Sequence, residues 1–312
     1  MRIKILAFGI IFTMLNFLIA IPEETQIVLF GITIILTGIP HGSLDFYLAK
    51  ENQTLHNRIF SQKKFYINYL LNMLTFAIFW YWFPYFSVLI FLLISAFHFG
   101  EIDFVHKGKA QAKWYFSTGY GLFIILFIIG SHLENSLQIL SYLLPDFKIS
   151  AHYILLIKSG IKWILILGLL SVIVVHITVI IKKYDAKLFL IFINQTICIL
   201  LTIKFLPFYL AFAFYFGLWH SLLSFEAILQ SLSLKNDKNG WKNLIIKALP
   251  FSAISLIGLT LLIFLGYNGQ NIPQIVSLLF IGISILTLPH FQVFSKALNK
   301  NRKKIVSLFI LN

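Results

Sequence analysis

The chain is dominated by long apolar runs that are separated by short polar segments. A helix needs about 20 apolar residues to cross a bilayer, and runs of that length recur along the sequence. They predict an all-α integral membrane protein, a bundle of about ten transmembrane helices. The predicted helices are 3–21, 26–49, 65–83, 85–105, 114–131, 154–181, 188–204, 207–231, 244–267 and 274–296. The segment 132–153 is more polar and is expected to be a loop that could hold a short interfacial helix.

The positions of the basic residues orient this bundle. If ten helices alternate across the membrane from a cytosolic N-terminus, 21 of the 25 lysines and arginines fall on the cytosolic side and 4 on the other. An excess of positive charge is typical of cytosolic loops. The pattern therefore predicts both termini in the cytosol. No polar linker divides the chain, so 1–312 is expected to form a single membrane domain.

Composition supports the membrane assignment and narrows the possible partners. The chain is 59% hydrophobic and 12% charged, whereas a soluble domain is roughly 25% charged. Its net charge of +14 lies between the apolar runs, so it reflects orientation in a lipid bilayer and predicts no nucleic-acid partner. The single cysteine, Cys198, excludes an intrachain disulfide and redox chemistry at a cysteine pair.

Five of the nine histidines lie within apolar runs, where an ionisable side chain is costly and indicates function. One of them, His176, has no acidic neighbour and is interpreted as a packed core residue. The other four are His41, His98, His220 and His290. Their predicted helices all cross the membrane in the same direction, and these helices are 26–49, 85–105, 207–231 and 274–296.

These four histidines are also predicted to lie at similar depth. Counted from the outer boundaries of their helices, His41, His98, His220 and His290 are 17, 14, 13 and 17 residues along. The spread of four residues is roughly 6 Å at about 1.5 Å per residue, which helix tilt can absorb. We predict that the four imidazoles bind one metal ion inside the bilayer. The alternative is four separate core histidines.

Acidic residues follow three of the four histidines. They are Asp45, Glu101, Asp103 and Glu226, which stand four, three, five and six residues after their histidines. A metal-bound imidazole usually donates its second N–H to a carboxylate or a carbonyl. The four acids are therefore expected to support the ligands. The alternative places them at the cytosolic interface, solvated or paired with Lys50 or Lys107.

The ligand type restricts the metal. All-imidazole ligation suits Fe, Cu, Zn or Ni. A structural zinc would normally recruit cysteine, and Cys198 is far in sequence from all four histidines. Four neutral ligands with open coordination positions favour Fe(2+) that must bind O2.

Four motifs resemble a known family. They are GIPHGSLD at 38–45, FHFGEID at 97–103, GLWHS at 217–221 and LPH at 288–290. Over 26–296 the chain resembles the Brp/Blh family of membrane β-carotene 15,15′-dioxygenases. The resemblance implies a bacterial inner-membrane enzyme that uses iron and O2 to cleave the central double bond of β-carotene into two all-trans retinal molecules. It also implies a functional link to a retinal-binding rhodopsin.

The chain departs from the pattern of some family members at one position. Those members have a further histidine one turn after the Trp-His pair, where this chain has Ser224. If that histidine is a ligand in them, another residue must replace it here, and His290 is the candidate.

The substrate implied by the resemblance is a long hydrocarbon dissolved in the membrane, and a tunnel lined by aromatic side chains would suit it. The chain has 33 Phe, 13 Tyr and 6 Trp. The aromatic residues beside the candidate ligands are expected to contact the substrate, and these are Phe97, Phe99, Tyr215 and Trp219.

Several other functions lack their sequence signatures. A retinal-binding opsin would need a lysine in the middle of a helix. A di-iron desaturase would show HxxxH and HxxHH boxes, and a zinc intramembrane protease would show HExxH. None of these occurs in the chain. The remaining alternatives are a metal-cation transporter and a haem protein with bis-histidine ligation.

Overall fold

The computed structural model describes residues 1–54, 58–105, 114–144, 146–147, 186–267, 269 and 272–310, with the single positions 160, 163, 166, 170, 173 and 177. Every regular element in this part of the chain is helical, as the apolar runs predicted. Apart from those single positions, the predicted helix 154–181 and its His176 lie outside the described residues.

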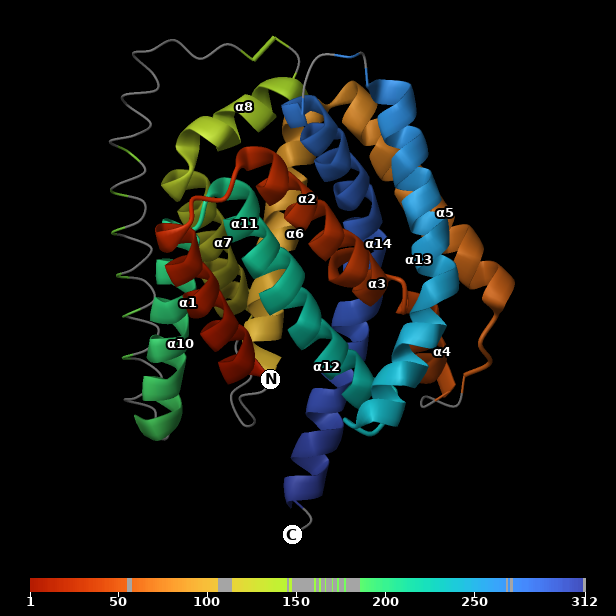
Figure 1. Cartoon of the computed structure of the whole chain (residues 1–312). Coiled ribbons are helices and arrows are strands. Elements are labelled where there is room, and N and C mark those ends of the chain that lie inside the picture. The colour runs from red at the N-terminus through yellow and green to blue at the C-terminus, as the bar shows by residue number, and fades with distance from the viewer. Residues whose placement is uncertain are drawn as a thin grey trace.

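The helices follow the predicted runs closely, and Figure 1 shows them gathered into one bundle. The elements are α1 (Arg2–Leu18), α2 (Glu23–Thr33), η1 (Ile34–Gly38), α3 (Ile39–Gly42), α4 (Asp45–Thr54), α5 (Gln62–Trp82), α6 (Pro84–Val105), α7 (Trp114–Ser131), α8 (Leu133–Leu143), α10 (Ala186–Phe205), α11 (Phe208–Phe212), η2 (Ala213–His220), α12 (Ser221–Ser231), α13 (Lys238–Gly266) and α14 (Ile272–Ile310).

Six helical segments in the described part are long and apolar enough to cross a membrane. They are Glu23–Thr54, Pro84–Asp103, Trp114–Ser131, Phe208–Ser231, Lys238–Gly266 and Ile272–Leu298. Three further predicted helices form as α1, α5 and α10 but do not meet that length and hydropathy. Multiple candidate spans are therefore present.

The segment 132–153 contains a short helix, α8, that lies across one end of the bundle (Figure 1). The Ser277 hydroxyl on α14 donates a hydrogen bond of 3.1 Å to the Ile139 carbonyl on α8. Leu133 and Ile139 are buried beneath the helix. This amphipathic helix therefore covers the end of the core near the start of α14.

Two of the predicted helices are not regular along their length. The helix 26–49 is divided into α2, the π-helical turn η1, α3 and α4, and the helix 207–231 contains the π-helical turn η2. Such turns widen a helix locally and are frequent at functional sites. The two turns pack against each other through glycines. A Cβ at Gly38 of η1 would lie 3.1 Å from Phe216 of η2, and a Cβ at Gly217 of η2 would lie 2.1 Å from Thr33 Cγ2 at the end of α2.

The closest helix packing joins α6 to α7. A Cβ at Gly100 would lie 1.8 Å from the Ser117 carbonyl oxygen, and a Cβ at Gly121 would lie 1.8 Å from the Ala96 carbonyl oxygen. Only glycine allows the backbones to approach so closely, as in other small-residue helix interfaces in membranes. This contact holds α6, which carries His98, firmly against the bundle.

We expect Gly121→Ala to destabilise the protein by about 1–3 kcal/mol, because the added methyl group overpacks a contact that has no room for it. Gly119→Ala is the matched control on the same helix, since a Cβ there would meet nothing within 4 Å. Thermal unfolding in detergent, followed by size-exclusion chromatography, measures both. Equal stability of the two variants would contradict the α6–α7 packing.

Candidate metal centre

Four separate elements bring the four predicted histidines together. His41 lies in α3, three residues after η1, and His220 is the last residue of η2. His98 lies in α6 and His290 in α14. Each of the four residues is at most 5% exposed. The four histidines that were predicted to meet therefore lie next to one another in space.

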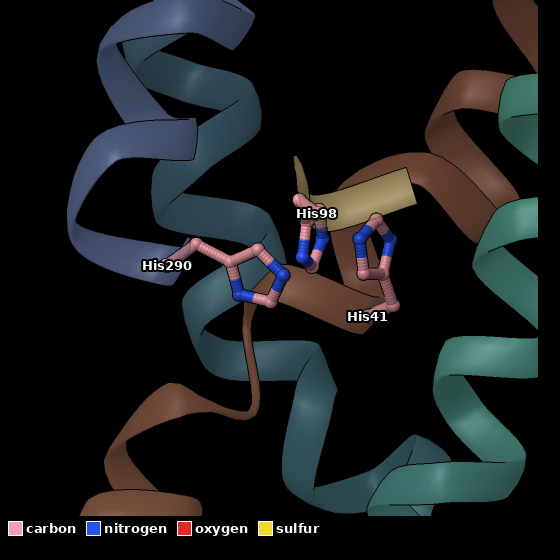
Figure 2. A group of neighbouring side chains, drawn as sticks. All are labelled: His41, His98 and His290. Carbon is pink, nitrogen blue, oxygen red and sulfur yellow. The ribbon is translucent and has the colours of Figure 1, made fainter. Parts of the chain in front are cut away.

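The four imidazole rings form a closed loop. Neighbouring ring centroids are 5.3 Å apart for His41 and His220, 4.7 Å for His220 and His98, 4.9 Å for His98 and His290, and 5.0 Å for His290 and His41. His41 and His98 face each other across the loop at 6.5 Å. Figure 2 shows the rings of His41, His98 and His290 converging.

The spacing of the ring nitrogens suits a single ion. One nitrogen from each of His41, His98 and His290 lies within 4.8 Å of the other two. Nitrogens that share one ion at about 2.1 Å lie at most about 4.2 Å apart. A small inward movement of the side chains would bring the three nitrogens to the spacing of ligands that share one ion.

Hydrogen bonds fix the orientation of two of the rings. His41 Nδ1 lies 3.2 Å from the Thr37 carbonyl oxygen, and His290 Nδ1 lies 2.8 Å from Asp45 Oδ1. Because a carbonyl oxygen can only accept, His41 Nδ1 carries the proton, and His290 Nδ1 carries it when Asp45 is ionised. The Nε2 lone pair of each ring is then available to a metal.

The remaining nitrogens lack protein partners. Both ring nitrogens of His98 and of His220, and Nε2 of His290, are buried with no hydrogen-bond partner among the described residues. An unsatisfied buried polar atom costs about 1–3 kcal/mol. A metal ion would satisfy one nitrogen on each ring, and an all-imidazole set suits Fe, Cu, Zn or Ni. The residues therefore fit a metal.

Asp45 connects two of the histidine-bearing segments. It begins α4, four residues after His41, yet its carboxylate bonds to His290 on α14. The Tyr69 hydroxyl donates to its other oxygen at 2.9 Å. The acid thus supports a different histidine from the one that precedes it in sequence. Tyr69 was not among the predicted site residues, because nothing in its local spacing points to Asp45.

Asp103 forms a second buried connection, between α6 and η2. It accepts hydrogen bonds from Trp219 Nε1 at 2.8 Å and from the Tyr215 hydroxyl at 3.4 Å. Arg2 Nη1 lies 3.8 Å from the same carboxylate, and its guanidinium lies 5.6 Å from the centre of the Trp219 ring. Asp103 is therefore buried and paired with Arg2, one of the 21 basic residues on the predicted cytosolic side.

The other two acids occupy different surroundings. Glu101 is 1% exposed and accepts a hydrogen bond from the Ser295 hydroxyl on α14 at 3.3 Å. Glu226 is only partly buried and accepts one from Asn236 Nδ2, also at 3.3 Å, in the loop after α12. Glu101 thus joins α6 to α14, whereas the contact of Glu226 leads away from the histidines.

A cavity of about 850 Å³ reaches all four histidines, within the range of about 300–1,000 Å³ for ligand sites. It extends toward Leu140 and Leu143 of α8 and sideways between α5 and α13. Its wall is mainly apolar and rich in aromatic rings. Those nearest the histidines include Phe99, whose ring centroid lies 4.6 Å from that of His220.

Only one of the four predicted substrate-contacting aromatics lines this cavity, and that one is Phe99. Phe97 instead packs edge-on against Phe291 on α14. Tyr215 and Trp219 are buried with their polar atoms bonded to Asp103. Other rings line the cavity instead: Phe46 and Phe216 lie five and four residues from His41 and His220, whereas Trp80 and Phe251 come from the separate helices α5 and α13.

The fold and the site together define a membrane protein with a buried polyhistidine centre beside a large apolar cavity. The family model described as Beta-carotene 15,15'-dioxygenase matches residues 32–297. The chain belongs to that family. It is also 28% identical over 258 residues to a Beta-carotene 15,15'-dioxygenase of Uncultured marine bacterium 66A03. The aligned residues make up 82% of this chain and 88% of that protein. No solved structure matches the chain.

We expect Asp45→Asn to weaken divalent-metal binding about 10–100-fold, because the amide no longer holds His290 Nδ1–H as firmly as the carboxylate does. Titration of metal-free protein with Co²⁺, followed by its visible absorption, measures the affinity. Glu134→Gln is the control, since Glu134 lies exposed on α8. An unchanged affinity in Asp45→Asn would show that this hydrogen bond does not support a ligand.

Proposed function

We propose that the protein cleaves β-carotene at its central 15,15′ double bond with O2 and releases two molecules of all-trans retinal. One observation carries the proposal: four buried imidazoles with available nitrogens stand on the wall of an apolar cavity among membrane helices. Family membership supplies the reaction, and the cavity suits a hydrocarbon. The C=C bond breaks, and one oxygen atom adds to each carbon, so the reaction needs no reductant.

The ligands in this proposal are His41, His98, His220 and His290, and the metal is Fe(2+). Iron bound there would supply the activation of O2. The protein residues hold the site in place: the Thr37 carbonyl orients His41, and Asp45 orients His290. Tyr69 keeps the Asp45 carboxylate directed toward α14 and itself lines the cavity.

The rings around the histidines exclude water from the reacting bond. Phe216 and Phe225 pack edge-on against His41, at centroid distances of 6.4 and 6.3 Å. Phe294 packs against His98 at 5.0 Å. A dry, rigid site protects a reactive polyene from side reactions. The aromatic faces can also stabilise positive charge that develops along the polyene.

The position of the histidines within the cavity suits a central cut. One arm of the cavity runs toward α8, and the other runs between α5 and α13. His98, His220 and His290 stand where the residues of α6, η2 and α14 that line the first arm end. The second arm continues from there past Asp45 and Phe46. A symmetric polyene that occupies both arms has its middle bond beside the imidazoles. Of the four aromatic residues that were expected to contact the substrate, Phe99 lines the cavity beside the histidines and remains a proposed contact.

We place the protein in a bacterial inner membrane with about ten spans and both termini in the cytosol, on the strength of the 21 to 4 division of basic residues. The retinal produced would serve a retinal-binding rhodopsin. That link is functional and requires no direct contact between the two proteins.

Expression in a β-carotene-accumulating bacterium should bleach the orange colour and yield retinal, detected by chromatography. His98→Ala should abolish both retinal formation and the iron of the purified protein, since it removes a ligand. The control is His132→Ala, because His132 binds the Ile203 carbonyl instead of the centre. Persistent colour without retinal in the wild type would refute the enzyme assignment. A Soret band in the purified protein would favour the haem alternative.

The fourth ligand can be tested separately. His290→Ala should lose most of the iron and the activity, whereas Ser224→Ala should retain both. The Ser224 hydroxyl only donates to the His220 carbonyl in its own helix, at 2.9 Å, so its loss removes no ligand. Iron content by mass spectrometry of purified protein measures the effect. Normal iron in His290→Ala would exclude His290 as a ligand.

A further inference from the structure

Helices α5 and α13 form opposite walls of one part of the cavity. Both pack against α14, while α5 also packs on α6 and α13 on α3. Neither of these two helices is a main packing partner of the other. Figure 1 shows both at the edge of the bundle that also holds α4. The space between them is therefore a cleft that has α14 as its floor.

The cavity-lining positions on the two helices recur at helical spacing. On α5 they include Tyr66, Leu70 and Met73, and on α13 they include Ile254 and Gly258. Spacings of three to four residues place such positions on one face of each helix. Each helix therefore turns a continuous stripe toward the cleft, and the two stripes face the same cavity as the histidines.

Several of these lining residues also reach the outer surface. Leu70 is 61% exposed and Ile254 is 65% exposed. Gly258 is exposed as well, and a Cβ there would meet nothing within 4 Å. Residues that line a cavity and are largely uncovered mark its opening. By contrast, the arm toward α8 includes the buried residues Ile128 and Ile139.

The surface around this opening is suited to lipid. Exposed neighbours on α5 are Leu71 and Leu74, and those on α13 are Ile257 and Leu261. The charged residues of α13 lie at its start, before the lining stretch. At one side an aromatic cluster narrows the cleft, because the ring of Phe46 stacks on Tyr66 at 5.5 Å and on Phe251 at 5.8 Å.

We propose that the cleft between α5 and α13 is the lateral mouth through which β-carotene enters the site directly from the bilayer. Leu70, Ile254 and Gly258 form its rim. This inference rests on the proposed function. A long hydrocarbon dissolved in lipid then reaches the histidines by sliding between the helices, without exposing its apolar surface to water.

The experiment fills the mouth without touching the histidines. Gly258→Phe places a ring in the open space of the cleft. Gly119→Phe is the matched control: that glycine is also exposed on an apolar helix, with nothing within 4 Å of an added Cβ, and it does not line the cavity. Both variants are reconstituted in liposomes that contain β-carotene. Iron content and size-exclusion profile establish that each is folded.

Two readouts are taken. The first is kcat/KM for retinal formation, which should fall at least tenfold in Gly258→Phe and less than twofold in Gly119→Phe. The second is the rate at which protein kept without O2 takes up β-carotene from the liposomes, which should fall by a similar factor. Uptake at the wild-type rate in a folded, iron-containing Gly258→Phe would overturn the lateral mouth.

The two proposals fail in distinguishable ways. If the wild type takes up β-carotene but forms no retinal, the proposed reaction is wrong, and the uptake comparison still decides the mouth. If the wild type forms retinal and Gly258→Phe does so with unchanged kcat/KM, the reaction stands and the mouth is wrong. A protein that takes up no β-carotene at all overturns both.

Discussion

Burial of polar groups in a region without water is the constraint on which this structure depends. Each imidazole or carboxylate inside the membrane must find a partner within the protein, because lipid offers none. Asp45 is hydrogen-bonded to His290, and Asp103 to Trp219. Glu101 accepts a hydrogen bond from Ser295. The imidazoles satisfy this requirement incompletely, since several of their nitrogens have no partner among the described residues. A metal ion would complete the set.

The same constraint explains how the site is held rigid. Asp45 joins α4 to α14, Asp103 joins α6 to η2, and Glu101 joins α6 to α14. These are the elements that carry His98, His220 and His290, or that follow His41 directly. Each acid thus sets the distance between two histidine-bearing segments. The glycine contacts between α6 and α7, and between η1 and η2, allow the close packing that these short polar bonds require.

Much of the fold and of the histidine cluster could be predicted from the sequence, because both depend on quantities that are local along the chain. Apolar runs locate helices, and a residue's distance from the end of its run gives its depth. Similar depth on helices of the same direction was the basis for predicting that His41, His98, His220 and His290 meet.

The partners of the acids could not be predicted in this way. Asp45 and His290 are 245 positions apart, and their contact depends on how α4 and α14 cross. Arg2 is a basic residue at the start of the chain and counted as cytosolic, yet its guanidinium lies against Asp103. The π-helical turns and the cavity wall likewise arise from packing among distant helices. For that reason Phe97, Tyr215 and Trp219, chosen as neighbours of the ligands in sequence, lie outside the cavity lining.

X-ray absorption spectroscopy of the iron-loaded protein tests the central claim most directly, because it reports the number and type of ligands around the metal. Convergence of the four rings predicts about four imidazole nitrogens at about 2.0–2.2 Å, and three in His290→Ala protein that is reloaded with excess iron. A spectrum with two or fewer imidazoles, or with the scattering of a porphyrin, would contradict it.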